Sequence, residues 1–107
     1  MSYNVKTIAV FERQARRLLK KYISLKKELN TLIQDLKENP EQGNYIGSGC
    51  YKIRLAIASK QKGKSGGARV ITHIVVNDQS VYLISIYDKS EKENLTDKEL
   101  QELLKGL

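Results

Sequence analysis

Residues 51–87, YKIRLAIASKQKGKSGGARVITHIVVNDQSVYLISIY, decide the fold. Apolar and polar side chains alternate over 51–58, which indicates a half-buried strand with Lys52 and Arg54 on its polar side. The β-branched and aromatic runs 69–76 and 81–87 predict further strands, joined by a tight turn of polar residues. The intervening segment 59–68 contains no large apolar side chain and predicts a loop. The sequence therefore predicts an antiparallel meander of three strands.

Helical patterns precede this meander. Apolar residues recur at helical spacing over 11–22 and again over 25–36, with Ser24 in the N-cap position of the second helix. The segment 39–43 contains proline and glycine and ends that helix. Residues 3–8 are compatible with a short first strand. Because the connection between the helices is so short, we expect them to be antiparallel.

A last helix follows the meander. Thr96 and Glu99 form the pattern of a capping box, and an apolar stripe follows at Leu100, Leu103, Leu104 and Leu107. The predicted order is strand, two helices, three strands and a helix, which is an α+β arrangement with helices on one face of an antiparallel sheet. A chain of 107 residues supports one hydrophobic core, so we expect a single domain over 1–107.

The charge is large and unevenly distributed. The chain has 19 Lys and Arg against 12 Asp and Glu, a net charge of +7, which favours polyanionic partners and nucleic acid first. The segment 51–77 carries six basic side chains and no acidic one. We therefore expect this segment to form the surface that faces an anion.

Other classes of protein find no support in the sequence. The lone Cys50 cannot form an internal disulfide and has no neighbouring His or Cys, so neither a metal nor another cofactor is predicted. No apolar leader segment and no run of 18 apolar residues is present, so we expect a cytoplasmic protein without a membrane partner.

Three pieces of the sequence, taken together in order and spacing, resemble the RelE/ParE toxin superfamily in its HigB-like branch. They are the K-x-R strand at 52–54, the loop GKSGGARVI at 63–71 and the run YDKSEKENL at 87–95. The resemblance covers essentially the whole chain. It implies the RelE-like fold, an antiparallel sheet with two N-terminal helices packed on one face and a short C-terminal helix.

The resemblance also implies a function. Such proteins are toxins of type II toxin-antitoxin systems, ribosome-dependent endoribonucleases that cut mRNA in the decoding site and are silenced by a cognate antitoxin. The residues that match the motifs, and would form the catalytic site, are Lys52, Arg54, Lys64, Arg69, Tyr87 and Lys89. Further basic residues suit contact with RNA: Arg13, Arg16, Arg17, Lys20, Lys60, Lys62 and Lys92. The sequence departs from its relatives at Thr72 and His73, where an aromatic residue is common, so stacking on a base is not expected there.

Cleavage of RNA by transesterification requires a base for the 2′-hydroxyl, positive charge at the phosphoryl oxygens and an acid for the leaving oxygen. His73 is the only histidine, which excludes a mechanism with two histidines. A lysine or tyrosine must serve instead, while Arg54 and Arg69 are better suited to gripping phosphate because arginine is too basic to exchange protons. We expect weak activity without the ribosome, because the substrate must be held in line.

Alternatives remain open at this point. The same fold also supports a ParE-like toxin that binds and poisons DNA gyrase, although a gyrase-binding surface needs no phosphate clamps. A non-catalytic nucleic-acid-binding module explains the charge but not the specific run of motifs. Lys52 and Arg54 could also be a solvated strand face, Arg69 a structural ion-pair partner and Tyr87 a core residue.

Overall fold

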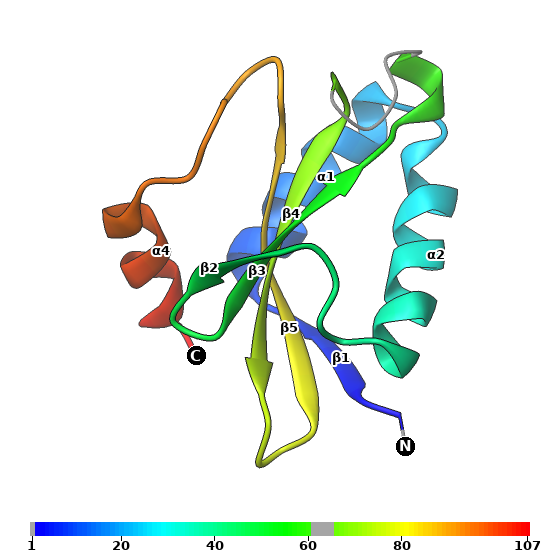
Figure 1. The fold of residues 1–107 in the computed structure, drawn as a ribbon. Coiled ribbons are helices and arrows are strands. Elements are labelled where there is room, and N and C mark those ends of the chain that lie inside the picture. The colour runs from blue at the N-terminus through cyan, green and yellow to red at the C-terminus, as the bar shows by residue number, and fades with distance from the viewer. Residues whose placement is uncertain (1, 61–65) are drawn as a thin grey trace.

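A computed structural model describes residues 2–60 and 66–107 and shows an α+β fold (Figure 1). In chain order the elements are β1 (Asn4–Thr7), α1 (Ala9–Lys21), α2 (Leu25–Glu38), β2 (Asn44–Gly47), β3 (Cys50–Leu55), the 3-10 turn η1 (Ala58–Lys60), β4 (Ala68–Val75), β5 (Ser80–Asp88) and α4 (Asp97–Leu104). Within the described ranges, no helix combines the length and the apolar character that crossing a bilayer requires. The predicted α+β class is confirmed.

The strands form one five-stranded sheet in the order β1-β5-β4-β3-β2. The predicted meander is confirmed, since β3 pairs antiparallel with β4 and β4 antiparallel with β5. The sheet is mixed rather than purely antiparallel, because β1 lies parallel to β5 at the far edge. The pairing of this short first strand depends on where the α1–α2 hairpin returns the chain, and no local pattern encodes it. The short strand β2 was not predicted, because its four residues are all exposed or only partly buried.

Helices α1 and α2 cover one face of the sheet, and α4 lies on the other side (Figure 1). The first core cluster joins the buried leucines of both helices to Ile53, Val70 and Ile86, which are paired across β3, β4 and β5. A second, smaller cluster joins Leu100 of α4 to the opposite side of the same strands. Because side chains alternate between the faces of a strand, residues next to Ile53, Val70 and Ile86 point away from α1 and α2.

The helix termini confirm one prediction and correct another. At α4 the Thr96 hydroxyl accepts a hydrogen bond from the Glu99 backbone N–H, and the Glu99 carboxylate accepts one from the Thr96 N–H, so the capping box is present. At α2 the helix begins where predicted, but Ser24 does not cap it. Its hydroxyl instead donates to the Glu28 side chain at 3.1 Å and lies 2.9 Å from the Ser59 hydroxyl. Ser24 therefore links α2 to η1.

Candidate nucleic-acid interface

Three of the predicted site residues lie directly opposite one another on adjacent strands. Arg54 of β3 pairs with Arg69 of β4, and Arg69 pairs with Tyr87 of β5. Directly opposed residues of antiparallel strands point to the same face, with their Cβ atoms about 5 Å apart. We call Arg54, Arg69 and Tyr87 the arginine row. It lies on the face of the sheet that α1 and α2 leave uncovered.

The arginine row places two positive charges side by side, which is unfavourable for directly opposed residues unless an anion lies nearby. Arg54 is exposed, whereas Arg69 is only 4% exposed and donates a hydrogen bond from Nη1 to the Ala68 carbonyl at 3.2 Å. Guanidinium groups present several donors in a planar fork that matches the oxygens of a phosphate. The row is therefore suited to binding a phosphate, with Arg54 as the accessible group.

Tyr87 supplies a hydroxyl at the end of the row. Its side chain is buried, and burial raises the pKa of Tyr87 above its usual value, while the charge of Arg69 and the Leu95 backbone oppose that rise. The phenol is therefore protonated at neutral pH. In that state it can donate a hydrogen bond to a phosphate or sugar oxygen, and it cannot act as a general base.

The part of β5 that carries Tyr87 follows an irregularity in the sheet. The pairing of β4 with β5 skips Ile84, which is an extra residue in β5. Just beyond it, the Gln14 side chain of α1 accepts hydrogen bonds from the Ser85 hydroxyl at 3.1 Å and from the Ile86 N–H at 3.0 Å. Gln14 thus accepts the hydrogen bond of a β5 backbone N–H beyond the residues that pair with β1.

Lys52 lies on the same face, two residues before Arg54. It is partly buried, and its Nζ lies 3.5 Å from the Asn94 side-chain oxygen. A cavity of about 220 Å³ separates Lys52 from the segment around Asn94 and from Leu100 of α4. A second cavity of about 380 Å³ lies between Lys52, Arg54 and the Gln42–Asn44 backbone turn. Lys52 therefore lines both cavities, and Arg54 lines the second.

The two remaining predicted catalytic lysines differ. Lys89 follows Tyr87 at the end of β5, where its backbone N–H donates to the Gly67 carbonyl at 3.0 Å and its Nζ lies 3.4 Å from Glu93. It is near the row but carries its own carboxylate neighbour. Lys64, and with it the predicted RNA contact Lys62, lies outside the described residues.

The predicted RNA contacts of α1 are not on the face of the arginine row. Arg13, Arg16 and Lys20 are exposed on the outer side of α1, which packs against the opposite face of the sheet. Arg17 is also exposed, but it forms an ion pair with Glu91 at 2.7 Å. Lys92 forms one with Glu99 at 2.5 Å, a contact that lowers the pKa of Glu99 to about 2. The structure therefore divides the predicted basic residues between two surfaces.

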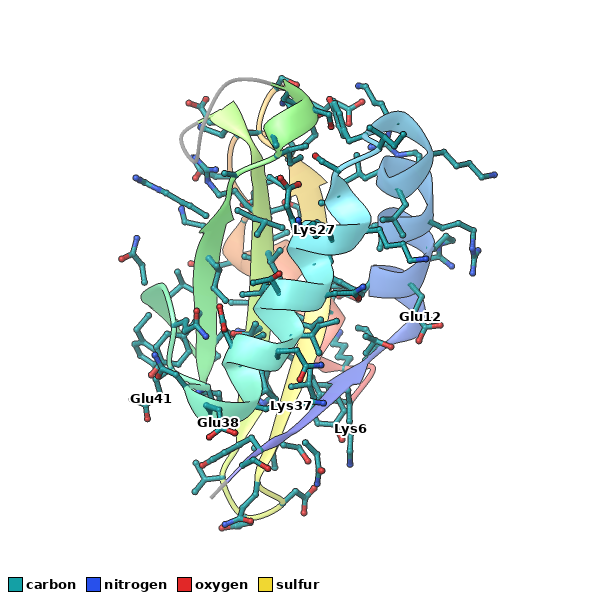
Figure 2. The ribbon with its side chains drawn as sticks, turned by 90° about the vertical axis from the view of Figure 1, so that its right-hand side faces the viewer. Lys6, Glu12, Lys27, Lys37, Glu38 and Glu41 are labelled. Carbon is teal, nitrogen blue, oxygen red and sulfur yellow. The ribbon has the colours of Figure 1, made fainter. Side chains whose placement is uncertain are left out.

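The α2 side of the molecule carries charges of both signs. Figure 2 shows Lys27 and Lys37 on α2, with Glu38 and Glu41 close to its end. A surface of mixed sign has a weaker attraction for a polyanion than one that carries only cations. This side is therefore a poorer candidate for RNA binding than the outer face of α1.

Lys60 is placed differently from the prediction. Its side chain is only 7% exposed, and its Nζ lies 2.6 Å from Oδ1 of Asp88. It also lies 5.5 Å from the centre of the Tyr22 ring, within the range of a cation–π contact. This burial leaves Lys60 little surface for contact with RNA. Sequence analysis had not identified Asp88, because it follows Lys60 by 28 residues and nothing local links the two.

Cys50 and His73 meet across β3 and β4, although they are far apart in the sequence. The Cys50 Sγ lies 3.4 Å from the His73 Nδ1. Burial raises the pKa of the Cys50 thiol to about 11, so it remains protonated and is a poor nucleophile or metal ligand. Across residues 2–60 and 66–107, no group of three or more His, Cys, Asp or Glu side chains is arranged to hold a metal ion.

Comparison with known proteins decides the family. The sequence matches the family described as "RelE toxin of RelE / RelB toxin-antitoxin system" over residues 5–106. The chain belongs to the RelE toxin family. It is therefore a toxin of the kind found in toxin-antitoxin systems. The resemblance to RelE toxins is confirmed, and the HigB-like branch stays a prediction.

Solved RelE structures share the fold of this RelE-family chain. The Escherichia coli RelE toxin in a doubly substituted mutant form, in the free state, is 18% identical and matches with a TM-score of 0.63 over 98% of this chain and 97% of that one. The same mutant in complex with a RelB antitoxin peptide is 21% identical, with a TM-score of 0.62 over 89% of this chain and 100% of the other. The RelBE2 toxin-antitoxin complex of Mycobacterium tuberculosis is 14% identical, with a TM-score of 0.58 over 82% and 92% of the chains.

The arginine row of this RelE-family toxin contains charge but no strong base at neutral pH. The arginines cannot give up a proton, Tyr87 holds its own, and His73 lies four residues along β4 from Arg69, about 13 Å at the rise of a strand. The described site can therefore bind a phosphate and stabilise negative charge on its oxygens.

Proposed function

We propose that this RelE-family toxin is a cytoplasmic, ribosome-dependent endoribonuclease that uses no cofactor, cuts mRNA on the ribosome and thereby inhibits translation. The observation that supports this most is the arginine row, in which two guanidinium groups and a phenol stand in register across three strands. A phosphate contacts many donors at once on such a surface. Transition-state charge on the phosphoryl oxygens is then stabilised by groups that are already in place.

Each residue of the proposed site has a role. Arg54 binds the phosphate from the exposed side, and Arg69 stabilises the charge that develops during cleavage. Tyr87 donates a hydrogen bond, and Lys52 adds positive charge from the hollow beside Arg54. Lys89, two residues after Tyr87, and Lys64, which lies outside the described residues, complete the proposed catalytic set. Because Arg69 is only 4% exposed, a phosphate reaches it only after side chains around it have moved.

Dependence on the ribosome follows from this chemistry. Neither the arginines of the row nor the protonated Tyr87 is suited to remove the proton of a 2′-hydroxyl at neutral pH, so the reaction depends strongly on the geometry of the substrate. An RNA held with its 2′-oxygen, phosphorus and leaving oxygen in line reacts much faster than a mobile one. We propose that the ribosome supplies this geometry, and that free mRNA is cut slowly.

The outer face of α1 supports the same proposal. Arg13, Arg16 and Lys20 are exposed there, away from the arginine row. We propose that they contact ribosomal RNA while the row contacts mRNA. Arg17 and Lys92 would join them only by exchanging their present carboxylate partners for phosphate.

A cognate antitoxin is the second proposed partner. The structural relatives include a RelE toxin in complex with a RelB peptide and the RelBE2 toxin-antitoxin complex. By analogy, we propose that an antitoxin binds this chain and blocks the arginine row or displaces α4. Leu100 of α4 is buried, Leu103 and Leu104 pack partly buried against the same cluster, and a cavity of about 530 Å³ lies between α4 and the start of α1. This cavity beside α4 favours displacement.

The proposed function is tested by adding the purified toxin to a cell-free translation reaction and mapping mRNA ends by primer extension. We expect new mRNA ends within translated regions, and their loss when initiation is blocked. Arg54→Gln should reduce them, whereas Lys6→Gln, an equal loss of charge on the edge strand β1, should not. If the mRNA stays intact and the toxin inhibits supercoiling by DNA gyrase, the protein is a gyrase poison. If the mRNA stays intact and gyrase remains active, the result supports a non-catalytic nucleic-acid-binding module.

A further inference from the structure

A buried carboxylate lies beside Tyr87 but points to the opposite face of β5. Asp88 is completely buried, and both of its oxygens accept hydrogen bonds. Oδ2 accepts from the Tyr22 hydroxyl at 2.5 Å. Oδ1 accepts from Lys60 Nζ at 2.6 Å and from the Ser90 hydroxyl and N–H at 2.7 and 2.9 Å. A buried carboxylate with this many donors is firmly held.

The groups around Asp88 come from three separate parts of the chain. Tyr22 ends α1, Lys60 ends η1, and Ser90 lies in the turn after β5. Lys21 adds a charge 3.8 Å from Oδ2. Burial alone would raise the pKa of Asp88, but the bonds from Lys60, Tyr22 and Ser90 hold it well below its usual range. Asp88 is therefore ionised throughout the neutral range.

Asp88 also lies where both ends of the glycine-rich segment meet the sheet. Lys60, which precedes residues 61–65, is bonded to its carboxylate. On the other side of that segment, Ala68 pairs with Asp88 in the sheet, and Gly67 accepts a bond from Lys89. The η1 turn is held in addition by Ala58 N–H donating to Glu28 at 2.6 Å. The two ends of residues 60–67 are thus tied to one point on β5.

We infer that Asp88 is a positioning residue: its carboxylate fixes Lys60 beside the point where Ala68 joins the sheet, relative to Tyr87 and Arg69, and so sets the geometry of the phosphate site without touching RNA. This inference rests on the proposed function for its consequence in catalysis. The contacts themselves are independent of it. Tyr87 and Asp88 are neighbours in the chain, so a shift of the Asp88 backbone also moves the Tyr87 hydroxyl relative to Arg69.

The experiment compares Asp88→Asn, Lys60→Met and the double variant. Each single change leaves one buried charge without its counter-charge, which destabilises a protein strongly, whereas removing both charges is often tolerated. We therefore expect the double variant to regain most of the melting temperature that either single change loses. We expect its single-turnover cleavage rate on saturating programmed ribosomes to remain at least about tenfold below that of the parent, with ribosome affinity unchanged.

A second readout does not depend on cleavage. In protein with ¹³C-labelled tyrosine rings, the Tyr87 signals, assigned with Tyr87→Phe, should shift in the double variant although Tyr87 contacts neither substituted side chain. Glu91→Gln provides the matched control. It removes an exposed carboxylate from the same turn, three residues from Asp88, and should leave both the Tyr87 signals and the cleavage rate unchanged.

The outcomes separate this inference from the proposed function. If the parent cuts no mRNA on ribosomes, the proposed function fails, and the Tyr87 signals alone decide the role of Asp88. If the double variant cuts at the parental rate, or if its Tyr87 signals are unmoved, Asp88 only stabilises the fold and the inference is wrong. If the single variants cut more slowly and the double variant regains the cleavage rate together with stability, the same conclusion follows.

Discussion

Two groups of cations lie at neighbouring positions of this toxin and differ in what surrounds them. Lys60 is buried against Asp88, which lies 2.6 Å away. Arg54 and Arg69 stand directly opposite each other on the other face of the sheet. All three come from the stretch 51–77, which contains no acidic residue. The absence of acids in a stretch of sequence therefore does not show which of its cations are available to an anion, because the fold can bring a carboxylate from elsewhere.

The two groups of cations also have different roles. The buried pair of Lys60 and Asp88 joins η1 to β5, and its two charges neutralise each other. The arginine row brings two guanidinium groups into register on adjacent strands, and their planar donors suit the oxygens of an external phosphate. Substitutions at the two places should therefore change different measured quantities.

The largest expected effect is that of Arg69→Lys. Lysine keeps the charge but loses the planar fork that grips two phosphoryl oxygens. Loss of one such transition-state contact costs about 3 to 4 kcal/mol, or about a hundredfold to a thousandfold in rate. Single-turnover cleavage on programmed ribosomes should show this drop, while co-sedimentation with ribosomes changes little. A variant that keeps the circular dichroism of the parent and cuts at the parental rate would make Arg69 a structural residue.

The next effect concerns stability in acid. The pKa of Asp88 is lower in the folded state than its ordinary value of 3.8, so its carboxylate stabilises the fold fully above about pH 5 and less as the pH falls below 3.8. Between pH 5 and pH 2 the parent should lose on the order of 2 kcal/mol more free energy of unfolding than Asp88→Asn. Urea titrations at several pH values measure this difference. Parallel pH profiles for the two proteins would show that Asp88 gains nothing from Lys60.

A smaller effect is expected for Tyr87→Phe. Because burial raises the pKa of Tyr87, its hydroxyl is a hydrogen-bond donor rather than an efficient acid at neutral pH. Removing one such bond should cost about 1 kcal/mol, which is about fivefold to tenfold in the cleavage rate. The single-turnover rate measured from pH 6 to pH 9 checks this. A loss of a thousandfold or more would mean that Tyr87 transfers the proton itself.

The smallest effect sharpens the comparison between the two groups. Ribosome affinity should fall with salt, and Arg54→Gln should reduce the slope of log affinity against log salt by about 0.7 to 0.9, the loss of one phosphate contact. The double variant Asp88→Asn/Lys60→Met should leave this slope unchanged, because Lys60 is buried and paired with Asp88. Equal slopes for the two variants would remove the distinction between the groups.

Much of the fold was predictable because its signals are local. The alternation that begins at Tyr51, the β-branched runs 69–76 and 81–87, and the capping box at Thr96 each specify an element from neighbouring residues. The strand β3 nevertheless ends at Leu55 rather than at Ala58, which begins η1. The parallel pairing of β1 and the short strand β2 depend on contacts between distant segments. No periodicity in the sequence encodes such contacts.

The candidate site was predictable in the same partial way. Motif resemblance identified Arg54, Arg69 and Tyr87, which the sheet register places together. It could not show that Lys60 is neutralised by Asp88 or that Arg69 is almost fully buried. These properties arise from pairs of residues that are 28 or more positions apart or from packing around a side chain.

The central claim is that the arginine row cuts mRNA held on the ribosome. It is tested most directly by single-turnover cleavage of one end-labelled mRNA, either free or bound in the ribosomal decoding site, by the parent and by Arg54→Gln. We predict that the parent cuts the bound mRNA at least about a hundredfold faster than the free mRNA, and that Arg54→Gln loses most of this activity. Equal rates on free and bound mRNA, or a parental rate for Arg54→Gln, would contradict the account.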